Sequence, residues 1–195
     1  MPPLTEAGAT YRPIVFSGPM VLAIFARLKS VTRRVSLPCA RCQNIGEIHR
    51  QTRKGLTIVP CPRCHGIDLC PLGVPGDLLW VRETYEIGPA WVDAERVVGD
   101  EGFLYKATWE KNHLGPWRSP RFMPRRASRL TLRITDTRRE KLHAITDADV
   151  ALEGVFPSTR EEFSRRWDAL HTKREKPHPW ASNPDVWRIA FEVVT

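Results

Sequence analysis

A change of hydrophobic period between residues 20 and 35 is the feature that most constrains this chain. Apolar side chains first recur at helical spacing, at Met20, Val21, Ile24, Phe25 and Leu28. This spacing predicts an amphipathic helix with one buried stripe. Val31 and Val35 then favour a strand. Lys29 and Thr32 are therefore expected at a helix-to-strand corner, where side chains can converge on a pocket. The alternative is a solvated basic turn.

Basic side chains dominate the rest of the composition. The chain has 195 residues, a formal net charge of +8 and a pI near 9.6. Arginines gather at 33–34, 118–129, 133–139 and 160–166. This balance favours a polyanionic partner, of which nucleic acid is the usual one, although a basic protein without such a partner stays an alternative. The length is that of a single domain covering residues 1–195.

Hydropathy indicates no membrane association. No apolar run reaches the roughly 18 residues that a membrane-spanning helix needs. The first residues also lack the basic-then-apolar order of a signal peptide. We therefore expect a cytosolic protein.

Four cysteines form two C-x2-C pairs, Cys39 with Cys42 and Cys61 with Cys64. Four thiolates at this spacing predict one tetrahedral, structural Zn²⁺ site in a zinc-ribbon-like module, inserted at residues 37–70. Disulfides are disfavoured by the odd cysteine count and the lack of a secretion signal, and redox chemistry would need only one pair. Cys70 is left over, and the nearby histidines, His49 and His65, are possible substitute ligands.

The remaining pattern consists of short strands joined by a few short helices. Strands are expected at residues 13–16, 78–85, 103–107, 130–135 and 187–193, and helices near 146–153 and 160–170. Thr146 and Asp149 predict a capping box at the start of the first of these helices, and Gly154 is placed to end it. Strands and long helices do not alternate, which disfavours a parallel α/β sheet. The predicted fold class is α+β, a small mixed β-barrel with a few short helices.

A segment at residues 109–129 interleaves tryptophan, proline and arginine, and it includes Trp117, Arg125 and Arg126. Aromatic and guanidinium groups in one loop suit stacking on unpaired bases. The alternative is that the tryptophans pack on the core while the arginines face water. RNA or a modified nucleoside is therefore the expected partner.

Several of these segments resemble the ASCH domain, a relative of the PUA RNA-binding barrel. Lys29, Thr32 and Arg34 follow an amphipathic helix, as in that family's signature. Gly76 and Asp77 precede an apolar strand, and residues 145–154 and 187–191 are similar to the family's short acidic helix and last strand. Phage and prophage ASCH-like proteins are closer still, on residues 16–20, 32–35, 80–84 and 123–129. This resemblance implies a PUA-like barrel, with the cysteine module inserted into it. If the gene is phage-encoded, the expected location is the host cytoplasm.

The resemblance also implies a site. Bacterial ASCH amidohydrolases that deacetylate N4-acetylcytidine use a lysine, a threonine and a glutamate, which correspond here to Lys29, Thr32 and Glu153. In such a site the lysine is the base, the threonine attacks an amide carbonyl, and the glutamate orients the lysine or transfers a proton. Together with the arginine-rich segment, the candidate substrate-binding residues are Arg34, Trp80, Arg82, Glu83, Tyr85, Arg125 and Arg126.

Two features depart from those amidohydrolases: Arg27 replaces the family's glycine two residues before the lysine, and the chain is about twice as long. Three functions stay open: hydrolysis of an acylated base, non-catalytic binding of RNA or a modified base, and ribonuclease activity. The first of these requires Lys29, Thr32 and Glu153 to line one pocket.

Overall fold

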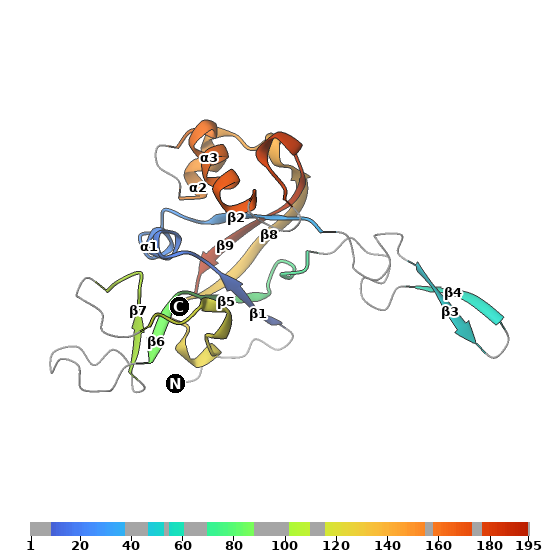
Figure 1. Cartoon of the computed structure of the whole chain (residues 1–195), viewed down its shortest axis with the longest axis horizontal. Coiled ribbons are helices and arrows are strands. Elements are labelled where there is room, and N and C mark those ends of the chain that lie inside the picture. Colours follow the sequence, from blue (N-terminus) through green and yellow to red (C-terminus); the bar gives the residue numbers. More distant parts are fainter. Residues whose placement is uncertain are drawn as a thin grey trace.

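A five-stranded sheet organises the protein, here described from a computed structural model (Figure 1). The structure describes residues 9–37, 47–52, 55–60, 70–87, 102–109, 116–154, 158–172 and 177–194. Its strands are β1 (Tyr11–Val15), β2 (Val31–Val35), β3 (Glu47–Thr52), β4 (Gly55–Pro60), β5 (Leu78–Arg82), β6 (Tyr85–Ile87), β7 (Phe103–Tyr105), β8 (Thr131–Lys141) and β9 (Asp185–Val193). Its helices are α1 (Gly18–Phe25), α2 (Asp147–Leu152) and α3 (Arg160–His171), with short 3-10 turns η1 (Pro120–Phe122), η2 (Arg125–Ala127), η3 (Leu142–Ala144) and η4 (Trp180–Ser182).

The sheet has the strand order β1-β5-β8-β9-β2. β1 and β5 are parallel, whereas every other neighbouring pair in this sheet is antiparallel. β8 and β9 form its longest pairing, with a β-bulge between Ile134 and Asp136. The α+β class is thus confirmed. A closed barrel is not seen, because in the described part of the chain β1 and β2 end the sheet without pairing with each other.

Three hydrophobic clusters hold the elements together. The largest lies between α1 and the sheet and is centred on Phe16, Ile24, Leu79 and Ile189. The second joins α2 and α3 to η3 and to the start of β9. The third lies under β6, β7 and the η1–η2 segment. Burying these apolar side chains supplies most of the drive to fold, at about 25 cal/mol per Å² of apolar surface.

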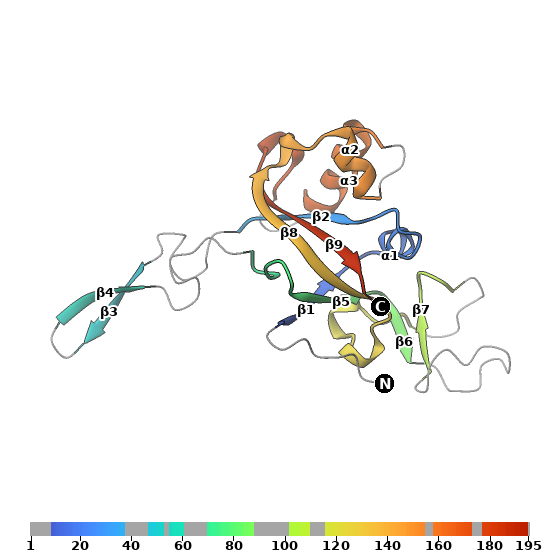
Figure 2. The same ribbon diagram turned by 180° about the vertical axis from the view of Figure 1, so that it is seen from behind.

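β3 and β4 form a hairpin that lies apart from the five-stranded sheet in both views (Figures 1 and 2). Their register pairs Glu47 with Pro60 and Thr52 with Gly55. The predicted zinc ligands, Cys39, Cys42, Cys61 and Cys64, lie outside the described residues, as does His65. Cys70 is described, and it is a buried free thiol in the main core. Among the described residues, no helix is long and apolar enough to cross a bilayer.

Candidate functional site

The corner between α1 and β2 is built by a tight helix end. The N–H of Arg27 donates to Ile24 O (2.9 Å) and the N–H of Leu28 donates to Ala23 O (2.8 Å). These two bonds form a Schellman motif, in which the residue after the cap adopts the left-handed conformation. Arg27 has a φ of 59°, so it adopts the conformation that glycine prefers. The chain reverses there and enters β2 two residues after Lys29.

The end of α2 meets this corner from the other side. Thr146 and Asp149 form the predicted capping box, and Gly154 ends the helix with a φ of 70°. A Cβ on Gly154 would lie 2.9 Å from Ala23 Cβ and 3.1 Å from Lys29 Cβ. Glycine is therefore needed here for close approach as well as for its backbone conformation. This contact sets Glu153 beside Lys29.

Lys29 and Glu153 form a buried ion pair, with Lys29 Nζ 2.8 Å from Glu153 Oε2. Their side chains are 0% and 5% exposed. The Lys29 ammonium also donates to Val31 O (2.7 Å) and to Glu153 O (2.9 Å). Burial lowers the pKa of Lys29 below its ordinary value, although the attraction of Glu153 opposes the shift. All three N–H groups of the ammonium thus have oxygen acceptors.

Arg33 extends the pair into a network that sequence reasoning missed. Its guanidinium lies 3.2 Å from Glu153 Oε1, 2.8 Å from Glu140 Oε1 and 3.3 Å from Asp149 Oδ2. Arg188 of β9 in turn contacts Asp149 Oδ1 at 3.2 Å. Burial alone would raise the pKa of Asp149, but the charge of Arg33 and the hydrogen bond from Thr146 lower it. The alternation of side chains along β2 could have predicted the burial of Arg33, since it places Arg33 on the same face as the apolar Val31 and Val35.

Thr32 is buried next to this network but lies on the opposite face of β2 from Arg33. Among these described residues, its hydroxyl makes no hydrogen bond with Lys29 or with Glu153. Arg34 shares the face of Thr32; it donates to Val15 O (2.7 Å) and lies over the Phe16 ring at 5.2 Å. Lys29 Nζ lies 5.6 Å from the same ring. The structure therefore brings Lys29 and Glu153 together and leaves Thr32 unbonded to them.

The other predicted binding residues lie around β5, β6 and the η1–η2 segment. Arg82 stacks over the Trp80 ring at 4.4 Å, and the Trp80 side chain is buried. Tyr85 is also buried and donates its hydroxyl to Phe122 O (2.9 Å). These two rings are packed in the structure rather than open to a base. Arg125 is exposed and lies 3.8 Å from the Tyr11 ring, and Arg126 is exposed as well.

Glu83 is committed to a buried ion pair. Its carboxylate is 2% exposed and accepts two hydrogen bonds from Arg129, at 3.0 and 2.9 Å. The Arg129 guanidinium also lies 3.9 Å from the Tyr105 ring and 5.0 Å from the Phe25 ring. This cluster ties α1 to β5 and β7. Phe25, which the sequence placed in the buried stripe of the first helix, is 44% exposed.

Comparisons with known proteins add one structural likeness. No protein-family model and no curated protein sequence matches the chain. The crystal structure of an ASCH domain from Lactobacillus crispatus JV V101 aligns at 10% identity, covering 95% of this chain and 80% of that one, with a TM-score of 0.43. At this TM-score the likeness carries no conclusion about fold or function. The described residues by themselves define an α+β protein with an open mixed sheet and a buried Lys–Glu–Arg network.

Proposed function

We propose that the protein acts on RNA or on a modified nucleoside, with Lys29, Thr32 and Glu153 as its chemical centre. The observation that carries this proposal is the buried 2.8 Å contact between Lys29 and Glu153, which lie 124 positions apart in the chain. The resemblance to ASCH amidohydrolases assigns catalytic roles to these two positions and to Thr32. Each of the three side chains is buried around one corner of the fold.

The proposed reaction is hydrolysis of an acyl amide on a nucleobase, as in N4-acetylcytidine. Thr32 Oγ1 attacks the carbonyl carbon, the C–N bond breaks, and the amine leaves with a proton. Water then cleaves the threonine ester and releases the carboxylic acid. Lys29 can take the threonine proton only as a neutral amine, and the burial that lowers its pKa acts in this direction. Glu153 accepts a hydrogen bond from the lysine and holds its position.

A non-catalytic reader is the second candidate, and one observation favours it. All three N–H groups of the Lys29 ammonium donate to oxygen atoms. A neutral amine would turn its lone pair toward one of these acceptors, which is unfavourable. In this arrangement Lys29 joins the end of α2 to β2, and the protein binds the base without changing it.

The test is turnover of N4-acetylcytidine, followed by chromatographic separation of cytidine. We expect Thr32→Ala to lower the rate by about 10³-fold or more, because loss of a nucleophile typically costs several orders of magnitude. Thr32→Ser retains a hydroxyl and should retain part of the activity. Thr135→Ala, at an exposed position of β8, is the matched control. Full activity of Thr32→Ala rejects this mechanism. An inactive wild-type protein that still binds the nucleoside in calorimetry is a reader.

We also propose that Cys39, Cys42, Cys61 and Cys64 hold one structural Zn²⁺. The register of the β3–β4 hairpin supports this, because Glu47 and Pro60 are paired at its open end. The chain therefore enters and leaves the hairpin side by side, five residues after Cys42 and one residue before Cys61. Four thiolates would close the metal's coordination, so it would stabilise the module and take no part in hydrolysis.

A further inference from the structure

We infer that residues 118–126 form a platform that binds a single-stranded nucleic acid, with Phe122 stacking on an unpaired base. Phe122 is 74% exposed, the largest exposure among the large hydrophobic side chains of the described residues. Arg118, Arg121, Arg125 and Arg126 flank it and are exposed. This segment is called the arginine platform below. The inference goes beyond the proposed function, since binding of a single-stranded nucleic acid here needs neither Thr32 nor hydrolysis.

The arginines of the arginine platform differ from the clustered arginines of β8 and α3 in whether they form ion pairs. Residues 116–129 include five arginines and no acidic residue. Arg118, Arg121 and Arg125 make no ion pair with any carboxylate that the structure describes. Five arginines of β8 and α3 are instead paired with acidic groups: Arg133 with Glu192, Arg138 with Glu140, Arg139 with Asp185, Arg165 with Glu161, and Arg166 with Glu162. Unmatched guanidinium groups in one short segment are suited to binding phosphates.

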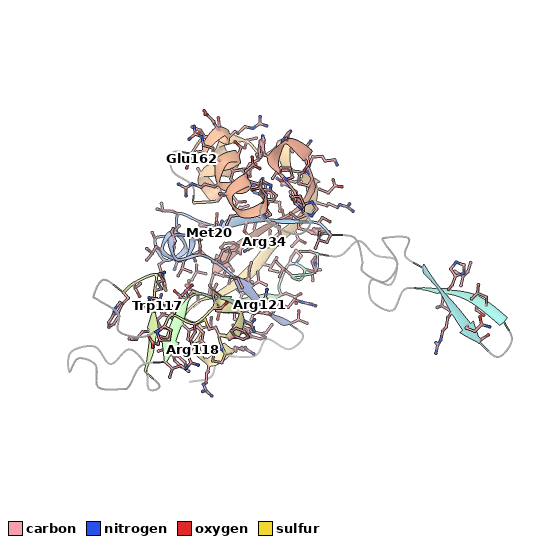
Figure 3. All side chains as sticks on the ribbon, in the orientation of Figure 1. Met20, Arg34, Trp117, Arg118, Arg121 and Glu162 are labelled. Carbon is pink, nitrogen blue, oxygen red and sulfur yellow. The ribbon has the colours of Figure 1, made fainter. Side chains whose placement is uncertain are left out.

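The platform backbone is fixed before any ligand arrives. Arg118 and Tyr85 exchange backbone hydrogen bonds at 2.8 and 3.4 Å. Arg82 donates to Arg121 O (3.1 Å), and the Tyr85 hydroxyl donates to Phe122 O (2.9 Å). Figure 3 shows Arg118 and Arg121 on the side of the protein that carries β5 and β6. A surface that is already ordered loses little conformational entropy on binding.

Two buried residues that follow Phe122, Met123 and Ala127, make its exposure a property of the fold. Met123 is 1% exposed and accepts a hydrogen bond from Glu83 N at its sulfur (3.3 Å). Ala127 is also 1% exposed, and its carbonyl accepts from the Tyr105 hydroxyl (2.8 Å). With Met123 turned into the core, the neighbouring Phe122 ring is held in solvent. An aromatic face between guanidinium groups is the arrangement that stacks bases and binds the strand backbone together.

The platform and the Lys29 corner lie at opposite ends of one strand. Arg125 stacks on Tyr11 at the start of β1, and Arg34 donates to Val15 O at its end. Five residues of extended chain span about 13 Å. A nucleic acid bound on the platform is thus within a few nucleotides of the Lys29 corner.

Binding of fluorescent oligonucleotides of about 12 nucleotides to the full-length protein, measured by anisotropy, tests this inference. Phe122→Ala should weaken binding of single-stranded RNA by about tenfold, because one stacking contact is lost. Phe122→Leu should be as weak as Phe122→Ala, since it keeps apolar volume without a π-face, and Phe122→Tyr should be close to wild type. Duplex RNA, whose bases are not available, should respond little to these changes.

The arginines are tested by replacing Arg118, Arg121 and Arg125 together with glutamine. The slope of log Kd against log salt should fall by about 2, at roughly 0.7 for each lost phosphate contact. The matched control removes the same charge from paired positions, by Arg138→Gln, Arg139→Gln and Arg165→Gln. Equal losses in the two triple variants would overturn the inference, because they would show a general effect of net charge. Unchanged binding by Phe122→Ala, equal affinity for duplex, or binding only to an acidic peptide or anionic vesicles would overturn it too.

Discussion

Arg27 should be a site where glycine stabilises the protein. Arg27 is exposed, has a φ of 59° and follows the cap of α1. A residue with a Cβ in this left-handed conformation costs roughly 1–2 kcal/mol. Glycine removes that cost but gives the unfolded chain more freedom, which costs about 0.5–1 kcal/mol. We therefore expect Arg27→Gly to raise the free energy of unfolding by about 0.5–1 kcal/mol.

The measurement is urea unfolding followed by tryptophan fluorescence, with Arg27→Ala as the control. Alanine removes the guanidinium but keeps the Cβ, so it should stay within about 0.5 kcal/mol of the wild type. For a chain of this size, 1 kcal/mol corresponds to a shift in Tm of about 2–4 °C. If Arg27→Gly is no more stable than Arg27→Ala, then the residue is not strained and the Schellman motif is not the stable end of α1.

Two further predictions concern Lys29 and the cysteines. Because burial lowers the pKa of Lys29 in the folded protein, the unfolded chain binds more protons between that lowered pKa and the ordinary value of 10.5. The free energy of unfolding should therefore rise with pH across that window relative to Lys29→Met, and parallel pH profiles in denaturant titrations would contradict this. Metal analysis should find about one zinc per chain, removed by a strong chelator and by Cys61→Ser but retained by Cys70→Ala. A folded preparation without metal would rule out the zinc site.

Local sequence rules predicted the elements that depend on neighbouring residues. The Thr146–Asp149 capping box and the role of Gly154 were predicted because both devices act within one helix. The strand at Val31–Val35 followed from its alternation. The strand predicted at residues 130–135 was too short, since β8 runs to Lys141. Its second half is polar, and it pairs with β9 beyond a bulge that breaks the alternation.

The candidate site was predictable only in part. The resemblance named Lys29 and Glu153, and the structure places their side chains in contact. The helix ends at Phe25 and the chain reverses at Arg27, so the predicted stripe fails at Phe25 and at Leu28, which is 49% exposed. The spacing of apolar residues predicts a buried stripe only where the helix continues. A helix end in the left-handed conformation is usually marked by glycine, and Arg27 at this position gave no such signal. Contacts between distant segments, such as that of Arg33 with Glu140, leave no local pattern.

The net charge of +8 describes the chain without indicating which surface binds a partner. Arg33 and Arg129 form ion pairs with the buried carboxylates of Glu153 and Glu83, so their charges are neutralised within the folded protein. The arginines of β8, and Arg165 and Arg166 of α3, are matched at the surface, where each exposed pair is worth at most about 1 kcal/mol but still cancels the local field. The unmatched groups that the structure describes at 118–125 therefore contribute more to the attraction of an anion than their number suggests. Among the described residues, pairing set by the fold thus distinguishes the arginines at 118–125 from the clustered arginines of β8 and from Arg165 and Arg166 of α3, which share the same charge in the sequence.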